Sequence, residues 1–296
     1  MLVSVVIPSY NHKDYVLQTI ESVLSQSWPN IDLIVIDDGS RDGSPEVIRK
    51  FHEVRGGFRF IARENRGLLK TLNEGLGLAR GELFCELASD DYLPVGSVEQ
   101  RVNYLQEHPE CVAVFGDGYR VENEVLTDQR FIDERRRRLF SSKDPIADML
   151  VGALPVFSTG LIRRQVLLAI GGFDDITFRY YEDLDTPVLL SLQGGLGFVD
   201  APLICRRQHE TNISSSTSHI RVEKVLCYRK LLSEPRMGAY RSLLKRQMRR
   251  SLLALGRHLS RVGGGTPRER EVFRQGWAYA FPDLRLCWYL IRWGKR

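Results

Sequence analysis

Residues 82–94 read ELFCELASDDYLP, and this stretch decides the fold. It begins with a short apolar run of the kind that forms a buried strand. The run ends in two adjacent carboxylates, Asp90 and Asp91, after which come Pro94 and a helical pattern from Ser97. Because open α/β sheets bind their ligands beyond the carboxyl ends of the strands, the two acids are candidates for a functional site. The alternative is a solvated turn, in which Asp is common.

Strand-like and helix-like segments alternate along the first half of the chain. The expected strands are residues 2–7, 31–36, 58–62, 82–87 and 112–115, and the helices between them begin near residues 16, 44, 68 and 97. This order predicts an α/β fold with a mostly parallel central sheet flanked by helices. Polar groups follow three of the strands, at residues 8–10, 37–38 and 90–91. We expect these three ends to line one crevice.

The later segments are less regular. Residues 122–144 are rich in charge and include four consecutive arginines at 135–138, so we expect a solvated loop there. Residues 157–162, 196–199 and 203–205 have the apolar pattern of short strands. Beyond residue 219 the pattern is helical and basic, and three glycines at 263–265 divide this tail into two parts.

Composition excludes several classes of protein. The chain contains no GxxxxGK[ST] motif, and a PSYN sequence rather than a glycine fingerprint follows the first strand, which argues against P-loop and dinucleotide-binding enzymes. The five cysteines form no CxxC pair, which argues for a reducing compartment and against structural zinc. We expect no signal peptide and no membrane-spanning helix, because no window has the required apolar length.

The charge is unevenly distributed. Residues 221–296 hold 19 Lys/Arg and 5 Asp/Glu, a net +14, so residues 1–220 carry −9 of the overall +5. We therefore expect two regions, a catalytic domain at 1–218 and a basic helical C-terminal region at 219–296. The basic region either rests on an anionic membrane surface or packs as a helical subdomain with its cations in water. Nucleic acid is not an expected partner, because no recognition motif accompanies the charge.

The strand-end acids suit a divalent cation and an activated phosphate. Mg²⁺ and Mn²⁺ take oxygen ligands, so Asp90 and Asp91 are candidates for holding a metal that neutralises a diphosphate. Asp38 can accept a hydrogen bond from a nucleobase, and Tyr10 can stack on it. Asp183, at the start of a predicted helix after Tyr180-Tyr181-Glu182, is the candidate general base for an acceptor hydroxyl. The alternative for Asp183 is helix capping.

In their order and spacing, these segments resemble the inverting family 2 glycosyltransferases, which have the Rossmann-like GT-A fold. The resemblance covers about residues 3–215 and rests on five segments. These are VVIPSYN at 5–11, SVLSQS at 22–27, VIDDGS at 35–40, the NRG, NEG and ARGE sequences between 65 and 82, and SDD at 89–91. Arg207-Gln208-His209 resembles the family's late Arg-x-His element. Many members have an acid where Ala88 stands here, which makes a longer DxDD run, and this chain keeps only Ser89-Asp90-Asp91.

The resemblance implies a role for each matching residue. It implies that Pro8, Tyr10, Asp38, Asn65 and Asp90 bind the nucleotide-sugar, with Asp90 on the ribose and metal side. It further implies that Asp91 and His209 bind Mn²⁺ or Mg²⁺ and that Asp183 is the catalytic base.

Together these observations predict a metal-dependent, inverting glycosyltransferase. Its donor would be a nucleotide-diphosphate sugar of the UDP or dTDP type, and its acceptor a hydroxyl on a saccharide or lipid-linked acceptor in bacterial surface polysaccharide or glycolipid assembly. We expect it in the cytoplasm, peripheral on the inner face of the cell membrane. Two alternatives remain, a sugar nucleotidyltransferase and a non-catalytic binding protein that retains the fold.

Overall fold

The computed structural model describes residues 1–179, 183–209, 217–279 and 284–293. The chain forms two compact units, one made of Met1–Pro145 with Ala153–His209 and the other of Ile146–Gly152 with Glu210–Arg296. The short segment 146–152 belongs to the second unit, where the Tyr228 hydroxyl donates a hydrogen bond to the Leu150 carbonyl at 3.0 Å. Sequence pattern alone does not reveal that residues 146–152 belong to the second unit, because their assignment depends on contacts with a distant part of the chain.

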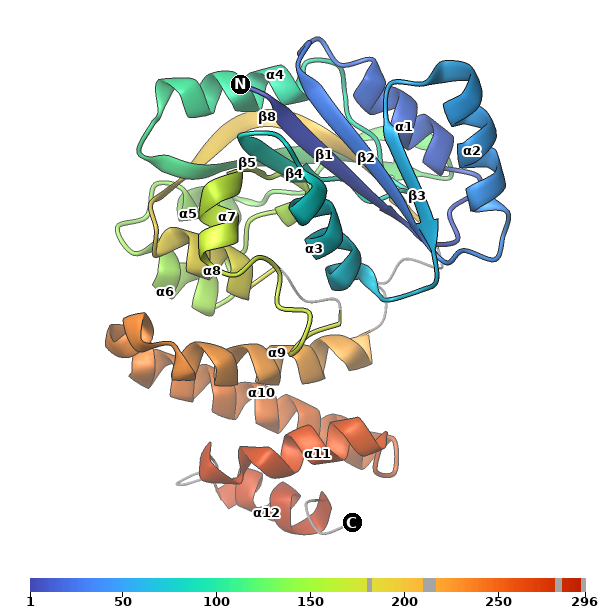
Figure 1. Ribbon diagram of the computed structural model, residues 1–296. Coiled ribbons are helices and arrows are strands. Elements are labelled where there is room, and N and C mark those ends of the chain that lie inside the picture. The colour runs from blue at the N-terminus through green and yellow to red at the C-terminus, as the bar shows by residue number, and fades with distance from the viewer. Residues whose placement is uncertain (180–182, 210–216, 280–283, 294–296) are drawn as a thin grey trace. The chain divides into compact units, whose positions relative to one another are not determined.

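The strands and helices alternate as expected in the first half of the chain (Figure 1). The α/β unit contains β1 (Val3–Ser9), α1 (Val16–Leu24), β2 (Ile31–Asp38), α2 (Ser44–Arg55), β3 (Arg59–Arg63), α3 (Leu68–Leu78), β4 (Leu83–Glu86), α4 (Ser97–Glu107), β5 (Cys111–Glu122), β6 (Val125–Arg130), α5 (Glu134–Leu139), η1 (Phe157–Thr159), β7 (Leu161–Arg163), α7 (Arg164–Ala169), α8 (Asp185–Ser191) and β8 (Gly195–Gln208). The helical unit contains α6 (Pro145–Leu150), α9 (Thr217–Ser233), η3 (Pro235–Tyr240), α10 (Arg241–Arg261), α11 (Pro267–Gln275), η4 (Gly276–Tyr279) and α12 (Leu284–Trp293).

One eight-stranded sheet organises the α/β unit, in the order β3-β2-β1-β4-β7-β5-β6 with β8 paired to β5. The β3-β2-β1-β4 half is parallel throughout, β7 is antiparallel to both β4 and β5, and β8 runs parallel to β5. The predicted α/β class, with a mostly parallel sheet between helices, is confirmed.

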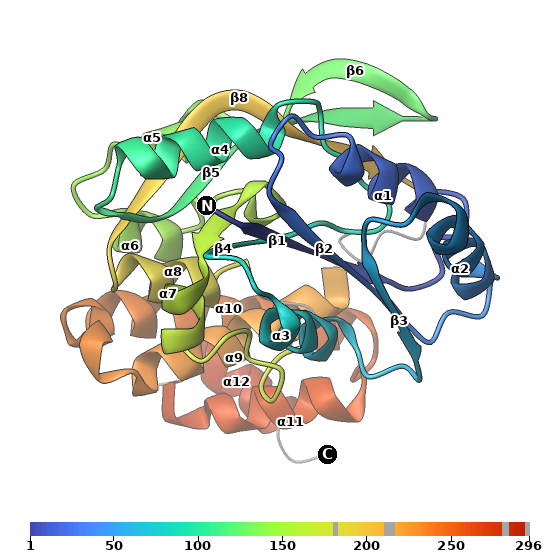
Figure 2. The same cartoon turned by 45° about the horizontal axis from the view of Figure 1, so that its top comes forward.

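The two faces of the sheet are covered by different helices. Val3, Val5 and Ile7 of β1 lie in one core with apolar side chains of α1, α2 and α4. On the other face, a Cβ at Gly75 of α3 would come within 2.4 Å of the Val6 side chain, so this glycine lets α3 lie close against β1. Figure 2 shows α1 and α2 on one side of β1–β3 and α3 on the other. Coverage on both faces explains why these strands are continuously apolar.

The expectation of a loop at residues 122–144 is wrong, because this segment forms β6 and α5. A buried acid, Asp117, organises it. The Asp117 carboxylate accepts hydrogen bonds from the backbone N–H groups of Phe131 and Ile132 at 2.8 and 3.0 Å and forms an ion pair with Arg130 at 2.8 Å. The expected strands at 196–199 and 203–205 are one continuous strand, β8, whose register against β5 shifts in between.

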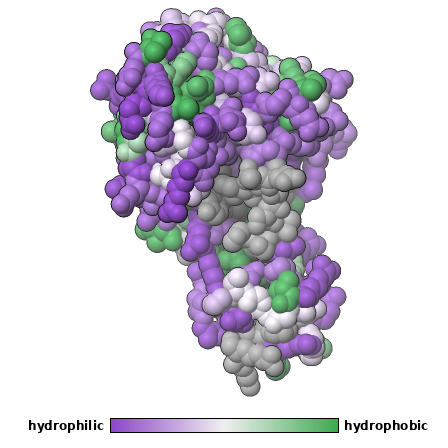
Figure 3. Space-filling view, turned by 90° about the vertical axis from the view of Figure 1, so that its right-hand side faces the viewer, coloured by the Kyte–Doolittle hydropathy of each residue, from purple (hydrophilic) through white to green (hydrophobic). Residues whose placement is uncertain are grey.

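In the helical unit, the glycines at 263–265 separate α10 from α11, as predicted. All three have positive φ, and Thr266 then starts α11 with a reciprocal capping box to Glu269. Figure 3 shows one face on which apolar side chains are scattered among hydrophilic ones. Within the described ranges, we find no helix with the length and apolar character needed to span a bilayer.

Candidate nucleotide-sugar and metal site

Three polar strand ends meet at one edge of the sheet. β1 lies between β2 and β4 and is parallel to both, and Ser9 at the end of β1 pairs in register with Asp37 of β2. The residues that follow β1, β2 and β4 therefore emerge side by side, as the sequence predicts. β8 reaches the same region, because Tyr92 and Cys205 exchange backbone hydrogen bonds at 3.1 and 2.8 Å.

At the end of β2, Asp38 fixes the loop that leads into α3. Its two carboxylate oxygens accept hydrogen bonds from the backbone N–H groups of Arg66 and Gly67 at 2.7 and 2.9 Å, and it forms an ion pair with Arg63. Gly39 follows with φ of +78°, and a Cβ there would lie 2.6 Å from the Asn65 backbone nitrogen. Asp38 and Asn65, two of the predicted donor-binding residues, thus lie in neighbouring loops.

Pro8 and Tyr10 lie at the end of β1 beside this loop. Tyr10 is 46% exposed, so its ring is accessible to a flat ligand. Asn11 has φ of 56° and joins the β1 and β2 loops, because its side-chain oxygen accepts from the Arg41 N–H at 2.8 Å and its own N–H donates to Ser40 Oγ at 2.8 Å. These bonds hold the β1 and β2 ends together.

At the end of β4, Asp90 is the centre of a cluster with two histidines. Its Oδ2 lies 3.0 Å from His209 Nε2 and 3.9 Å from His12 Nε2. His12 Nδ1 is occupied by Ser89 Oγ at 2.8 Å, which turns Nε2 toward Asp90. Tyr15 stacks on the His209 ring with centroids 5.2 Å apart and fixes its plane. One ligand atom from each of His12, Asp90 and His209 lies within 4.8 Å of the others.

This cluster fits a divalent cation. Three converging donor atoms, two nitrogens and one carboxylate oxygen, leave coordination positions for a diphosphate and water. Imidazole ligands favour transition metals over Mg²⁺, which prefers oxygen and stays hydrated. In a ligating His12, Nδ1–H donates to Ser89 Oγ, and this is the outer-shell contact that orients the imidazole.

Asp91, the other acid of the pair, is in a different environment. Its Oδ1 accepts a hydrogen bond from the Arg207 backbone N–H at 2.9 Å, and its carbonyl accepts from Thr19 Oγ1 at 2.6 Å. Burial, followed by the neighbouring Asp90 charge, raises the pKa of Asp91 to about 8. The three-residue cluster described above contains Asp90 and does not contain Asp91.

Arg207 anchors the turn that carries both acids. The residue is 3% exposed, and its guanidinium donates to the Asp90 carbonyl at 2.5 Å, to Gln18 and to Glu124 at 3.0 Å. Its guanidinium carbon also lies 5.0 Å from the Tyr15 ring centroid. A planar guanidinium with five donors suits such a multiple anchor.

Asp183 lies within electrostatic reach of β4 and β8. The described residues begin again at Asp183, so the preceding Tyr180, Tyr181 and Glu182 are outside them. Asp183 is exposed to solvent, yet the protein around it raises the pKa of its carboxyl through desolvation, while Arg206 and Arg136 oppose the rise. This desolvation makes the carboxyl more basic than that of an ordinary Asp.

Glu86, at the end of β4, interacts electrostatically with Asp183. The pKa of Glu86 is raised to about 8. Desolvation is the largest cause, and the charge of Asp183 is the second. A carboxyl with this pKa keeps its proton at neutral pH. Glu86 therefore belongs to the surroundings of the candidate base.

Three residues of this region are not among the sequence predictions, namely His12, Arg207 as an anchor, and Glu86. His12 follows the first strand by three residues, and Glu86 is an acid within an otherwise apolar strand. Either feature is a signal that sequence reading can use. No sequence feature indicates that the Arg207 backbone bonds to Asp91, because β4 and β8 meet only through the fold.

Comparison with known proteins identifies a family and several relatives. The family model described as glycosyl transferase family 2 matches residues 4–171. An uncharacterised glycosyltransferase of Rickettsia typhi is 26% identical over 222 residues, 73% of this chain and 66% of that protein. The putative teichuronic acid biosynthesis glycosyltransferase TuaG of Bacillus subtilis is 28% identical over 156 residues, 52% of this chain and 61% of TuaG. The chain spans only 26–66% of the length of the first two curated relatives that it matches.

Solved structures share the fold at low sequence identity. TarS of S. aureus, solved in complex with UDP-GlcNAc, has a TM-score of 0.67 at 18% identity, over 100% of this chain and 89% of that one. The mannosyltransferase PcManGT from Pyrobaculum calidifontis, in complex with GDP-Man and Mn²⁺, has a TM-score of 0.62 at 18% identity, over 98% and 84% of the two chains.

Proposed function

Because the chain belongs to glycosyl transferase family 2, we propose that it transfers a sugar from a nucleotide-diphosphate donor to a hydroxyl group with inversion at the anomeric carbon. One observation carries the proposal. The Asp90 cluster lies at the sheet edge where Asp38 and Tyr10 also emerge, and a carboxyl with raised pKa, Asp183, acts electrostatically on the same strand end. A glycosyl transfer needs these parts together: a nucleotide cradle, a site for the diphosphate and a base.

We assign the nucleotide to the β1 and β2 ends. The exposed Tyr10 ring offers a stacking surface beside Pro8, and Asp38 and Asn65 offer polar groups for the base and ribose. TarS has been solved with UDP-GlcNAc and PcManGT with GDP-Man, so the shared fold accommodates more than one nucleobase. For this chain we propose a donor of the UDP or dTDP type.

We assign the diphosphate to the Asp90 cluster. His12, Asp90 and His209 would hold Mn²⁺, with Mg²⁺ the less suited ion, and a bound cation supplies positive charge that stabilises the departing diphosphate. The chain's own part is to hold these ligands in place. Asp90 is anchored through its carbonyl by Arg207, and His12 is oriented by Ser89. In this proposal Asp91 is a second candidate ligand. Its carbonyl accepts from Thr19 Oγ1 and its carboxylate from the Arg207 backbone N–H, and these bonds keep the turn in shape.

Asp183 is the proposed base. Its carboxylate would accept the proton of an acceptor hydroxyl while that oxygen attacks the anomeric carbon and the bond to the diphosphate breaks on the opposite side. A raised pKa brings the base closer to neutral pH and makes proton transfer more favourable. Glu86, protonated at neutral pH, adds no second negative charge beside it.

For the acceptor, we propose a saccharide or lipid-linked acceptor of bacterial surface polysaccharide. TuaG is described as a glycosyltransferase of teichuronic acid biosynthesis, which supports this class by analogy. We further propose that the protein works at the inner face of the cell membrane, held peripherally by its basic helical region. The net charge of +14 over residues 221–296 supports attraction to anionic lipid.

The test of this function is Asp183→Asn. We expect turnover to fall by about 10²-fold or more, because the amide cannot accept the proton, while donor affinity remains within about twofold. Asp175→Asn, eight residues earlier in the sequence and with no role assigned to it, is the matched control. Turnover by single-turnover assay and donor affinity by calorimetry separate the two effects. Unchanged turnover in Asp183→Asn would remove Asp183 as the base.

A further inference from the structure

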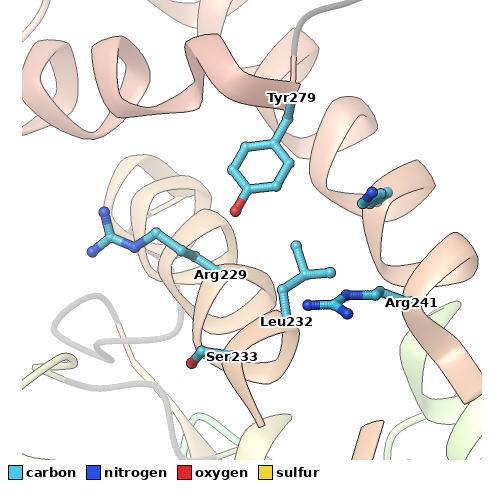
Figure 4. A pocket seen from close by; sticks show the side chains of 6 residues that line it. Arg229, Leu232, Ser233, Arg241 and Tyr279 are labelled. Carbon is cyan, nitrogen blue, oxygen red and sulfur yellow. The ribbon is translucent and has the colours of Figure 1, made fainter. Parts of the chain in front are cut away.

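The helical unit contains a cavity of its own, apart from the strand-end site. It has a volume of about 490 Å³ and is lined by Arg229, Leu232 and Ser233 of α9, Arg241 and Lys245 of α10, and Tyr279 of η4. In Figure 4 the guanidinium of Arg241 and the hydroxyl of Tyr279 point toward the space beside Leu232. A volume of this size is in the range of small-molecule sites.

The lining is strongly positive. Of the six described residues that line it, three are cations and none is an acid. Arg229 donates a hydrogen bond to the Gln275 side chain, which uses one of its five N–H donors. Arg241 and Lys245 are exposed and stand four residues apart, so they lie on the same face of α10.

Two other cations of this unit form ion pairs with acids. Arg236 pairs with Glu234 at 2.7 Å, and Arg268 pairs with Glu223 at 2.8 Å. Over the described ranges, no carboxylate forms such a pair with Arg229, Arg241 or Lys245. Three positive charges around one cavity repel each other, and an anion inside the cavity relieves that repulsion.

The two helix ends at the cavity, the start of α10 and the end of α9, have opposite electrostatic effects on an anion. Arg241 is the first residue of the 21-residue helix α10, whose amino end is the positive pole of its dipole. α9 ends at Ser233, so its negative pole lies at the same cavity, and the Ser233 hydroxyl donates to the Lys230 carbonyl at 2.6 Å. The attraction for an anion therefore comes from the three side chains, with Tyr279 as a further hydroxyl donor.

We propose that this cavity binds a phosphate or diphosphate group. Two guanidinium groups offer paired N–H donors that match two phosphate oxygens, and Lys245 adds a point charge. Three cations match the charge of a diphosphate better than that of a single carboxylate. The same chemistry is offered by a soluble phosphate ester and by the headgroup of a membrane lipid. This binding does not require the donor site, because every lining residue belongs to the helical unit.

The experiment measures binding to the full chain with divalent metal removed by EDTA, so that metal-dependent binding of diphosphate at the Asp90 cluster is suppressed. One arm titrates inorganic pyrophosphate in a calorimeter. The other sediments the protein with vesicles of phosphatidylcholine alone or mixed with phosphatidic acid. The double variant Arg241→Gln with Lys245→Gln is compared with Arg246→Gln with Arg250→Gln, which removes two exposed cations of α10 outside the cavity.

We expect the cavity variant to bind at least about tenfold more weakly than the control variant, because charge-assisted contacts are lost. If the cavity variant binds pyrophosphate more weakly, the ligand is a soluble phosphate. If it is weakened only in binding to phosphatidic acid vesicles, the ligand is a lipid phosphate. Equal binding by the two variants, or no binding of either probe by the unaltered chain, overturns the proposal. Neither result depends on sugar transfer, so the cavity and the glycosyltransferase proposal fail separately.

Discussion

Glu86 is an ionisable residue held in its neutral form at the end of a strand. Burial and the charge of Asp183 raise its pKa from 4.5 to about 8, whereas in the unfolded chain it ionises near the ordinary value. Between these two pH values the folded state keeps a proton that the unfolded chain releases. The free energy of unfolding therefore falls as pH rises through this window. Above about pH 8 the loss of unfolding free energy that Glu86 causes stays constant.

Glu86→Gln tests this linkage, because the amide mimics the protonated acid at every pH. We expect the variant to match the unaltered protein near the ordinary pKa of 4.5 and to be the more stable of the two at about pH 8. The gain in unfolding free energy should be on the order of a few kcal/mol, since each pKa unit corresponds to about 1.4 kcal/mol. Thermal and urea unfolding at both pH values measure it.

Glu107→Gln, at an exposed position of α4, is the control and should show no such pH-dependent gain. If Glu86→Gln is equally stable or less stable at the higher pH, Glu86 is ionised in the folded protein. In that case the neutral form that we assign to Glu86 would be wrong.

The candidate metal site is assembled from three elements. His12 stands between β1 and α1, Asp90 follows β4, and His209 follows β8. Arg207, within β8, connects them by donating its side chain to the Asp90 carbonyl and its backbone N–H to Asp91. Because each element contributes one ligand, the site forms only when the β4 and β8 ends are correctly paired.

We expect His12→Ala to weaken Mn²⁺ binding by about tenfold or more, a loss of the size that removal of orienting or ligating groups produces at metal sites. His108→Ala, which removes a partly exposed imidazole at the C-cap of α4, serves as the matched control. Calorimetry with Mn²⁺, in the absence of donor, measures the affinity independently of turnover. Equal affinity in the two variants would reduce the site to Asp90 and His209.

At the level of elements, the parallel half of the sheet was predictable and the rest was less so. Apolar runs that stop at Pro8, Asp37 and Asp90 mark the strand ends, and parallel pairing then brings those ends to one edge. β6 and α5 were not predictable, because their charged sequence resembles a loop. What orders them is buried Asp117, which accepts two backbone hydrogen bonds from residues 131 and 132.

The same distinction applies to the site. Asp38 and Asp90 are indicated by their positions at strand ends, a local feature of the sequence. The environment of Asp91 and the role of Arg207 depend on how β8 meets β4. Sequence spacing carries no information on that contact, since the two strands are far apart in the chain and do not pair along their length.

Across the whole molecule, charge separates the chain into two regions. Residues 1–220 carry −9 and residues 221–296 carry +14. An acidic catalytic region is unfavourable near anionic lipid, and a basic region is favourable there. The helical unit also presents apolar side chains to solvent at spacings of four and three residues along α12, with Leu284 82%, Trp288 51% and Ile291 58% exposed.

These three side chains form one stripe on α12. The guanidinium carbon of Arg292 lies 5.1 Å from the centroid of the Trp288 ring. An amphipathic helix of this kind inserts its apolar face at the boundary of headgroups and acyl chains. We expect Leu284→Ser with Trp288→Ser to weaken binding to phosphatidylcholine–phosphatidylglycerol vesicles by about tenfold or more, as burial of two apolar side chains predicts. Val54→Ser, at an 89% exposed position of α2, should leave sedimentation unchanged. Full retention by the α12 variant would show that this stripe does not contact the membrane.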